Sequence, residues 1–336
     1  MSRIVLTAVG DLDRGIHLED TAASTPVLGP GDVLVAMEAA PLNNADFLLA
    51  QGWYGVQPAL PAALGSEGVG RVLEVGPEVS AELVGRRVMI LPTYDQGSWA
   101  DRVVASERSV VVVPDDVDPL QLAMLPINGA TAALMLRRYV DLRPGDWVVQ
   151  SLGTSAVARH VVALAQRAGV RVASVVRRPE AVAELQAAGD DLVLLDGEDV
   201  GERLVAALGG RHARLALEGA GGGMAGRLAQ ALELHGTLVT YSSATGEPPL
   251  LGLADLVYQE LALHGFWLIN WVWNAPRDEI RETYAELVGL LADGTLHADV
   301  EATYAIEDHR AAFAHAQRSG RAGKVLFTFD TNNQEG

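Results

Sequence analysis

Short runs in which apolar and polar residues alternate fill the first third of the chain. Four of them are bounded by glycine, proline or serine: GDVLVAMEAA (31–40), GVGRVLEVG (68–76), GRRVMIL (85–91) and ADRVVAS (100–106). Such alternation is typical of strands that bury one face, and the bounding residues are typical of turns. The pattern predicts a β-rich region over residues 1–121.

A different pattern begins near residue 120, where strand-length apolar runs alternate with amphipathic segments of helical length. WVVQSL (147–152) is followed by the segment VARHVVALAQRAG (157–169), and then by the apolar run VRVASVV (170–176). The alternation continues through later segments, of which MAGRLAQALELHG (224–236) is predicted to be one helix. Strands that alternate with helices are typical of a parallel sheet with helices on both faces.

The last part of the chain returns to the character of the first. A helix is predicted from about Arg277 to Ala292, and a strand, a helix and a strand follow over residues 300–329. We therefore predict a discontinuous β-rich domain, residues 1–121 plus 274–336, into which an α/β domain of residues 122–273 is inserted.

Composition narrows the classes of function. The 336 residues are 49% hydrophobic and 20% charged, which is typical of a folded chain with more than one domain. With 25 basic against 43 acidic residues the net charge is −18, so we expect no nucleic-acid partner. We also expect no membrane partner, because no apolar run approaches the ~18 residues that a membrane helix needs.

The chain contains no cysteine, which excludes disulfides, thiolate catalysis and cysteine-bound zinc. Its start, MSRIVLTAVG, moves directly into a strand pattern and shows neither a signal peptide nor a transit peptide. These two observations lead us to expect a cytoplasmic protein.

The turn that follows Val149 has the character of a nucleotide site. A small-residue turn between a strand and a helix directs free backbone N–H groups and the positive helix end at a pyrophosphate. The usual glycine fingerprint is reduced here, so a purely structural turn is the alternative. The predicted contact residues are Gly153, Thr154, Ser155, Ala156 and Val157.

The next predicted strand adds a second signal. It ends at Arg177 and Arg178, where enzymes specific for NAD have an acidic residue that holds the ribose 2′-hydroxyl. Two guanidinium groups suit a 2′-phosphate instead, because each presents paired donors to a phosphate. We therefore predict NADPH rather than NADH as the cofactor, with a solvated arginine loop as the alternative.

Four segments carry a resemblance to a known family: PLNNADFLLAQGWYG (41–55), LPAALGSEGVGRVLEVG (60–76), LRPGDWVVQ (142–150) and HGFWLINW (264–271). Through them the chain resembles the medium-chain dehydrogenases/reductases, in the zinc-free branch that contains quinone reductases and 2-enoyl thioester reductases. It is most similar to the mitochondrial-type trans-2-enoyl-CoA/ACP reductases.

The resemblance covers residues 25–328 and implies an α/β fold. In that fold a Rossmann domain, with a doubly wound parallel sheet, is inserted into a discontinuous GroES-like catalytic domain. Two rarer marks, Gln51 to Gly55 and Gly265 to Leu268, favour the enoyl reductases over the quinone reductases.

A metal is not expected. Relatives that carry zinc have a cysteine near the position of Asn43 and a histidine within the segment that reads Gly65 to Gly68 here. A catalytic zinc ion needs three nitrogen, sulfur or oxygen ligands. Those cysteine and histidine ligands are missing from this sequence.

Without a metal, the resemblance implies that NADPH reduces an activated carbon–carbon double bond. Hydride goes to the β-carbon of the enoyl substrate, and a proton goes to its α-carbon. A phenol with a pKa of about 10 stays protonated at neutral pH and can donate that proton. Tyr54 matches the family's donor, with a packing tyrosine in a loop as the alternative. Asn43 matches a loop asparagine at the family's catalytic site, with a turn-stabilising role as the alternative.

The resemblance also implies contacts to the nicotinamide end of NADPH. Asn128 and Thr131 match the segment beside the nicotinamide, and a cap at the start of a helix is their alternative. Phe266, Trp267 and Leu268 match a segment that meets the nicotinamide through its backbone. An apolar strand in the core or at a dimer edge is the alternative for these three.

Further cofactor contacts are implied elsewhere along the chain. Gly219 to Gly222 follow a predicted strand and would let the backbone approach the cofactor. Tyr241, Ser242 and Ser243 stand where the family has tyrosine and two glycines. Lys324 matches a lysine near the cofactor.

Three classes of function fit the sequence. The favoured class is an NADPH-dependent enoyl reductase that acts on a 2-enoyl thioester. A quinone or enone reductase, or a reductase of a small activated alkene in a dedicated pathway, is the alternative. A non-catalytic binding protein is the third, and the reduced glycine turn is its only support.

The apolar segment LALHGFWLINW (261–271) is predicted to form the last strand of the nucleotide-binding sheet. A bare apolar edge favours aggregation, and relatives cover it by pairing the edge strands of two subunits. We therefore expect a homodimer.

Overall fold

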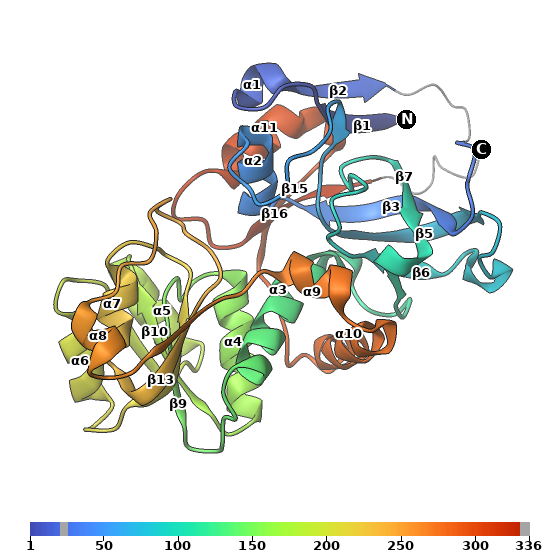
Figure 1. The fold of residues 1–336 in the computed structure, drawn as a ribbon. Coiled ribbons are helices and arrows are strands. Elements are labelled where there is room, and N and C mark those ends of the chain that lie inside the picture. Colours follow the sequence, from blue (N-terminus) through green and yellow to red (C-terminus); the bar gives the residue numbers. More distant parts are fainter. Residues whose placement is uncertain (21–25, 330–336) are drawn as a thin grey trace. The chain divides into compact units, whose positions relative to one another are not determined.

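The computed structural model describes residues 1–20 and 26–329 (Figure 1). The chain forms two compact units. Met1–Ala130 and Ile269–Gly336 make up the split unit, and Thr131–Leu268 make up the inserted unit. The predicted domain boundaries, after residues 121 and 273, fall inside helices α3 (Pro119–Arg138) and α9 (Leu268–Asn274), which belong partly to each unit.

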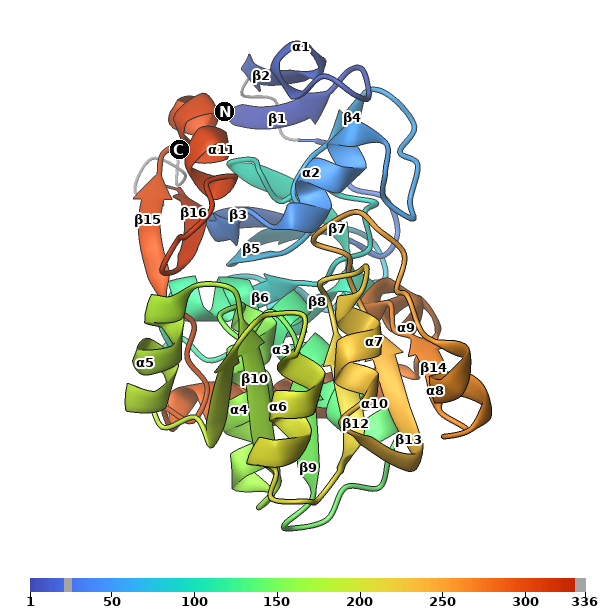
Figure 2. The same ribbon diagram turned by 90° about the vertical axis from the view of Figure 1, so that its left-hand side faces the viewer.

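The larger sheet of the split unit has seven strands, six of them in the order β15-β16-β3-β5-β6-β8, while β7 pairs with β3. The last strand pair enters this sheet beside β3, where Leu326 lies opposite Pro41 in antiparallel register (Figure 2). The C-terminal segment therefore completes a sheet begun near the N-terminus. The strands are β3 (Asp32–Pro41), β5 (Gly68–Val75), β6 (Arg87–Ile90), β7 (Arg102–Ser106), β8 (Val110–Val112), β15 (Val300–Tyr304) and β16 (Lys324–Thr328).

Smaller elements complete the split unit. A three-stranded sheet, in the order β2-β1-β4, contains β1 (Ser2–Leu6), β2 (Ile16–Asp20) and β4 (Ala62–Ala63). The helices are α1 (Leu12–Gly15), α2 (Asn44–Gln51), α10 (Arg277–Ala292) and α11 (His309–Ala316), with short 3-10 turns at Ala81–Leu83, Glu107–Ser109 and Ile306–Asp308. The predicted helix from Arg277 to Ala292 is confirmed.

An aromatic cluster fixes α2 against the larger sheet. The ring of Phe313, on α11, lies 5.6 Å from the ring of Phe47 on α2 and 5.2 Å from that of Trp99. Phe327 on β16 packs edge-on against Trp99 at 5.7 Å. Aromatic pairs at these separations add to the free energy gained from burial. The position of α2, and of the residues at its two ends, is therefore set by the core.

The inserted unit contains one parallel sheet in the order β11-β10-β9-β12-β13-β14. This order and the alternating helices confirm the predicted fold class, a Rossmann sheet inserted into a discontinuous β-rich domain. The strands are β9 (Trp147–Gln150), β10 (Arg171–Val176), β11 (Leu192–Leu195), β12 (Ala213–Glu218), β13 (Leu232–Thr240) and β14 (Ala262–Gly265). The helices are α4 (Ala156–Arg167), α5 (Pro179–Ala187), α6 (Val200–Ala207), α7 (Met224–Ala229) and α8 (Leu253–Val257).

Two predicted elements differ from the structure. The predicted helix over 224–236 ends at Ala229, because Leu232 already pairs with Ala213 of β12 and begins β13. The predicted strand over 261–271 ends at Gly265, and helix α9 begins at Leu268. The residues buried in α9 are Leu268, Ile269, Trp271 and Val272, which is the spacing of one helical face rather than of a strand.

Helix α3 corrects the expectation that no apolar segment reaches membrane-spanning length. Its 20 residues are long and apolar enough by length and composition alone. However, 78% of the apolar window is buried inside the protein. That degree of burial is typical of a core helix, which is hydrophobic on all sides because protein surrounds it.

Candidate active site

A chain of hydrogen-bonded polar side chains lies in the split unit where α2 begins, with Asn43 and Glu67 buried and Lys324 half-buried. The Nζ of Lys324 donates to Oδ1 of Asn43 at 2.5 Å, and Nδ2 of Asn43 donates to Oε1 of Glu67 at 2.8 Å. The other Glu67 oxygen accepts the backbone N–H of Ile127 at 2.7 Å. The side chain of Asn43 thus links Lys324 to Glu67, while Asn43 is also the N-cap residue of α2, so its turn-stabilising alternative stays open.

Burial changes the charges in this chain of contacts. The side chain of Glu67 is completely buried, and desolvation raises its pKa to about 7 although the nearby Lys324 ammonium acts in the opposite direction. Burial lowers the pKa of Lys324, and the Glu67 charge opposes that shift. The pKa of Glu67 therefore lies near neutrality, where a site that handles protons would need it.

A second buried carboxyl lies beside the first. Oδ2 of Asp46 accepts the backbone N–H of Asn43 at 2.9 Å, which satisfies one of the free N–H groups at the start of α2. Asp46 is completely buried, and desolvation raises its pKa to about 6, opposed by hydrogen bonds from Asn43 and Ser66. Asp46 was not among the predicted site residues.

Tyr54 follows α2 directly. The helix ends at Gly52, whose φ of 78° only glycine adopts without strain, and the chain turns there toward Tyr54. The ring of Tyr54 lies 5.2 Å from the ring of Tyr94, with 54° between the ring planes. Sequence reasoning missed Tyr94, because a single tyrosine in a loop has no periodicity that would mark it.

Asn128 and Thr131 lie in the middle of α3, which begins at Pro119. The alternative that they cap the start of a helix is therefore wrong. Nδ2 of Asn128 donates to the backbone carbonyl of Met124 at 3.0 Å, one turn earlier in the same helix. Both side chains are buried, and their contact with the nicotinamide stays a prediction.

The small-residue turn of the inserted unit has the local geometry of an anion site. A Cβ on Gly153 would lie 2.9 Å from side-chain carbons of Ser174 and Val176, so only glycine fits there. Oγ of Ser155 accepts the N–H of Ala158 at 3.1 Å and caps α4. The exposed Thr154 stands beside this helix end, and Ala156 and Val157 form the first turn of α4, whose N–H groups suit a phosphate.

The two predicted arginines directly follow β10, one of whose side chains lines Gly153. Arg177 is exposed and makes no ion pair with any described residue. Arg178 is half-buried and its guanidinium lies 3.4 Å from the carboxylate of Glu184. Arg177 is therefore available to a phosphate, whereas Arg178 would have to exchange its contact with Glu184 for one.

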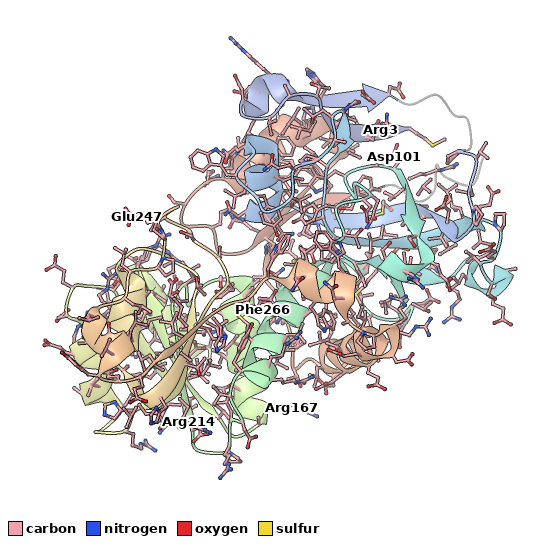
Figure 3. The ribbon with its side chains drawn as sticks, viewed as in Figure 1. Arg3, Asp101, Arg167, Arg214, Glu247 and Phe266 are labelled. Carbon is pink, nitrogen blue, oxygen red and sulfur yellow. The ribbon has the colours of Figure 1, made fainter. Side chains whose placement is uncertain are left out.

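A second glycine turn follows β12. A Cβ on Gly219 would lie 2.8 Å from the ring of Tyr241, so the glycine lets that ring approach the backbone. Burial raises the pKa of Tyr241 and keeps its phenol neutral, while a hydrogen bond with Ser155 opposes the shift. Tyr241 thereby joins the second turn to the first. Ser242 is exposed, and Oγ of Ser243 donates to the carbonyl of Glu247 at 2.7 Å (Figure 3).

The structure also shows a buried carboxylate in this turn that sequence reasoning missed. Oε1 of Glu218 accepts the N–H groups of Ala220 at 2.6 Å and Gly221 at 2.9 Å. The hydroxyl of Ser151 donates to the same oxygen at 3.3 Å. Burial raises the pKa of Glu218, and these hydrogen bonds oppose the shift. Glu218 fixes the backbone of the glycine turn.

The segment Phe266 to Leu268 connects β14 to α9. The N–H of Phe266 donates to the carbonyl of Thr240 at 2.8 Å, and the side chains of Phe266 and Leu268 are buried (Figure 3). The proposed backbone contact to the nicotinamide would therefore fall to Trp267 and Leu268, and it stays a prediction. Within residues 1–20 and 26–329, no group of three or more His, Asp or Glu side chains is placed to hold a metal ion.

Comparison with known proteins identifies the families that the two parts of the chain match. Residues 29–115 match the family described as "Alcohol dehydrogenase GroES-like domain", and residues 156–292 match that described as "Zinc-binding dehydrogenase". The mitochondrial enoyl-[acyl-carrier-protein] reductase of Rattus norvegicus is 35% identical over 324 residues, which cover 95% of this chain and 86% of that protein.

Solved structures show the same fold. A putative NADPH:quinone reductase from Bacillus thuringiensis matches with a TM-score of 0.90 and 26% identity, over 98% of this chain and 99% of that one. A mutant form of an enoyl thioester reductase from Candida tropicalis matches with a TM-score of 0.83 and 24% identity, again over 98% and 99% of the two chains. At that identity the second likeness concerns the fold alone.

Proposed function

Because the chain belongs to the enoyl-[acyl-carrier-protein] reductase family, within the medium-chain dehydrogenase/reductase superfamily, we propose that it is an NADPH-dependent reductase of 2-enoyl thioesters. The observation that carries the proposal is the phenol of Tyr54, held at the end of α2 against a second tyrosine. A positioned phenol is the proton donor that reduction of a carbon–carbon double bond needs.

The residues of the inserted unit fit NADPH. The first turn of α4, capped by Ser155, offers backbone N–H groups to the pyrophosphate. Arg177 and Arg178 offer guanidinium groups to the 2′-phosphate, in place of the carboxylate that would select NAD. Gly153 and Gly219 are positions at which a Cβ would meet neighbouring side chains at 2.9 Å or less, so both turns keep their backbone packing only as glycine.

NADPH, when bound, supplies the hydride that goes to the β-carbon of the substrate. Tyr54 then donates its hydroxyl proton to the α-carbon, and the electron pair of the broken O–H bond stays on its oxygen. The phenol regains a proton from solvent before the next turnover. Asn43 ties Lys324 to Glu67 and thereby fixes the polar environment at the start of α2.

A panel of substrates tests the proposal. The purified protein should oxidise NADPH with trans-2-enoyl-CoA thioesters, and Tyr54→Phe should lower kcat by roughly 10²-fold, the scale of general-acid effects. Affinity for NADPH, measured by fluorescence titration, should be unchanged, because the variant keeps the ring. A variant that turns over at the parental rate would exclude Tyr54 as the donor.

A quinone or enone reductase is the second candidate, and it is favoured by one observation. The Bacillus thuringiensis protein named as a quinone reductase shares 26% identity and a TM-score of 0.90. Enones and quinones belong in the same panel. A higher kcat/KM with quinones than with every thioester would transfer the assignment to this candidate.

We further propose a homodimer formed through β14, the edge strand of the inserted unit's sheet. Apolar side chains are exposed on this strand and on α8 before it, at Leu253, Val257, Tyr258 and Leu263. The cytoplasmic location stays a prediction, since the rat relative is named as mitochondrial. Fractionation of the source cells, followed by immunoblotting, tests the location.

A further inference from the structure

Tyr94 is a second phenol at the candidate donor site, in the loop of residues 92–97 between β6 and β7. We infer that Tyr94 positions Tyr54. Its O–H group donates a hydrogen bond to the Tyr54 oxygen as that oxygen gives its own proton to the substrate. This inference rests on the proposed function, in which Tyr54 is the donor. Tyr94 itself makes no contact with the substrate or NADPH in this proposal and acts only through the Tyr54 oxygen.

The backbone at Tyr94 is the first observation. Its φ is 63°, in the left-handed region that a bulky side chain rarely adopts. Such a conformation is strained and persists only where the surroundings fix it, most often at functional sites. An unconstrained loop tyrosine would relax to a negative φ.

Two side-chain hydrogen bonds fix the loop around Tyr94. Oγ1 of Thr93 donates to Oε1 of Gln96 at 2.8 Å, and Nε2 of Gln96 donates to the carbonyl of Leu91 at 3.0 Å. The Gln96 side chain is buried, so these hydrogen bonds are shielded from water. They hold the loop closed across Tyr94 and aim its ring at Tyr54.

The hydroxyl of Tyr94 is the second observation. Its oxygen is buried and has no partner at standard hydrogen-bond geometry among the described residues, yet it lies near enough to Tyr54 and Ser66 for both to influence its pKa. A buried polar group without a hydrogen-bond partner destabilises the fold. Catalytic hydrogen bonds are often long in the resting enzyme and shorten only as charge develops.

The direction of the hydrogen bond follows from which phenol keeps its proton. Burial raises the pKa of Tyr94 first, and the charges of Tyr54 and Asp46 raise it further. Tyr94 therefore remains the protonated member of the pair and acts as the donor. When Tyr54 gives its proton to the α-carbon, the negative charge on its oxygen meets the O–H of Tyr94, which stabilises it as an oxyanion-hole donor does.

Tyr94→Phe tests the inference, because it removes one hydroxyl and keeps the ring. Loss of one such donor lowers kcat by roughly 10²-fold in known oxyanion holes, and we expect a fall of that order. KM for the thioester and the affinity for NADPH should stay at parental values. Tyr304→Phe is the matched control, since Tyr304 bonds His315 elsewhere in the split unit, and it should turn over at the parental rate.

The double variant separates positioning from a general structural effect. In a Tyr54→Phe background no charge forms on residue 54, so adding Tyr94→Phe should lower kcat no further. A second, multiplicative loss would overturn the inference and leave the donor assignment intact. A parental kcat for Tyr94→Phe, together with a lowered kcat for Tyr54→Phe, would also overturn the inference and leave the donor assignment intact. A parental rate for Tyr54→Phe would overturn both.

Gln96→Ala tests the same contact without touching either ring. It releases the loop while both hydroxyls remain, so kcat should fall and KM should hold. This variant decides the question if Tyr94→Phe does not fold, which a thermal melt of each protein would show. A parental kcat for a folded Gln96→Ala would overturn the part of the inference that assigns positioning to the loop.

Discussion

Two opposing effects act on the charge of Glu67 and on that of Lys324. Each is held away from water, which disfavours its charged form, yet each lies near the other's charge. The Asn43 amide between them satisfies one hydrogen-bonding atom of each. Buried charges held in this way rarely stabilise a fold compared with apolar residues of the same size. Their presence at the start of α2 points to a role in the site.

The raised pKa of Glu67 predicts a specific dependence of stability on pH. An unfolded glutamate titrates near 4.5 and the folded one near 7, so between these values the folded protein holds a proton that the unfolded chain has released. The free energy of unfolding contributed by Glu67 is therefore full below pH 4.5 and is lost as the pH rises through 7. The loss is on the order of 3 kcal/mol.

Denaturant titrations of the parent and of Glu67→Gln, at pH values from 5 to 8, measure this contribution. The parent should lose stability relative to the variant as the pH rises, because the amide does not titrate. Glu202→Gln, at an exposed position of α6, is the control and should follow the parent at every pH. Parallel pH profiles for the parent and Glu67→Gln would contradict the prediction.

At the residue scale, the sequence offered a candidate only where a motif or a resemblance marked the residue. Asn43 and Lys324 were identified separately, and the structure shows that they contact each other. Asp46 and Tyr94 were missed for different reasons. An aspartate three residues into a helix is most often a simple cap, and a positive φ at a tyrosine leaves no trace in the sequence.

At the scale of elements, periodicity predicted most of the fold. The four alternating runs of the first third became β3, β5, β6 and β7. The wrong predictions arose where a short apolar run is compatible with both a helix and a strand. Leu232 to His235 alternates as a strand but also continues the helical pattern of α7, and only pairing with β12 decides between them.

The end of β10 carries the prediction on cofactor choice. Replacing Arg177 and Arg178 together by alanine removes the proposed partners of the 2′-phosphate. Each charge-assisted hydrogen bond contributes about 1.5–3 kcal/mol, so affinity for NADPH should fall by more than tenfold while that for NADH changes little. Fluorescence titration with both cofactors measures the change.

The control for this experiment is Arg167→Ala, labelled in Figure 3. Arg167 is exposed in the last turn of α4, about 16 Å along the helix axis from the N-terminal turn. The Arg167→Ala substitution removes one positive charge from the same unit without changing the proposed phosphate site. The affinities for NADPH and NADH should therefore stay at parental values. An equal loss for NADPH and NADH in the double variant would point to a structural role for the arginines.

At the scale of the whole molecule, net charge and exposed apolar surface have opposite effects on association: the charge opposes it and the apolar surface favours it. The net charge of −18 disfavours any partner that is itself strongly acidic, an acyl carrier protein of that character included. A thioester of coenzyme A carries fewer charges and is the form in which the substrate panel presents the enoyl group. Mutual repulsion also opposes association of two copies, so a dimer needs a substantial apolar contact.

The inserted unit offers such a contact at β14. This strand is the last of its sheet, and the hydroxyl of Tyr139 donates to the carbonyl of Gly265 at its end. Leu263 on the strand is 43% exposed, and Leu253 and Tyr258 on the preceding segment are 71% and 75% exposed. An open strand edge with exposed apolar neighbours is a template for pairing with a second copy across a two-fold axis.

Light scattering at micromolar concentration should therefore give twice the chain mass of 35.5 kDa. Leu263→Asp places a charge in the proposed interface and should shift the protein to the mass of one chain. Val84→Asp is the matched control, because Val84 is 48% exposed in the split unit and should leave the dimer intact. A parental protein that scatters as a single chain would rule the dimer out. A dimer that survives Leu263→Asp would show that another surface joins the subunits.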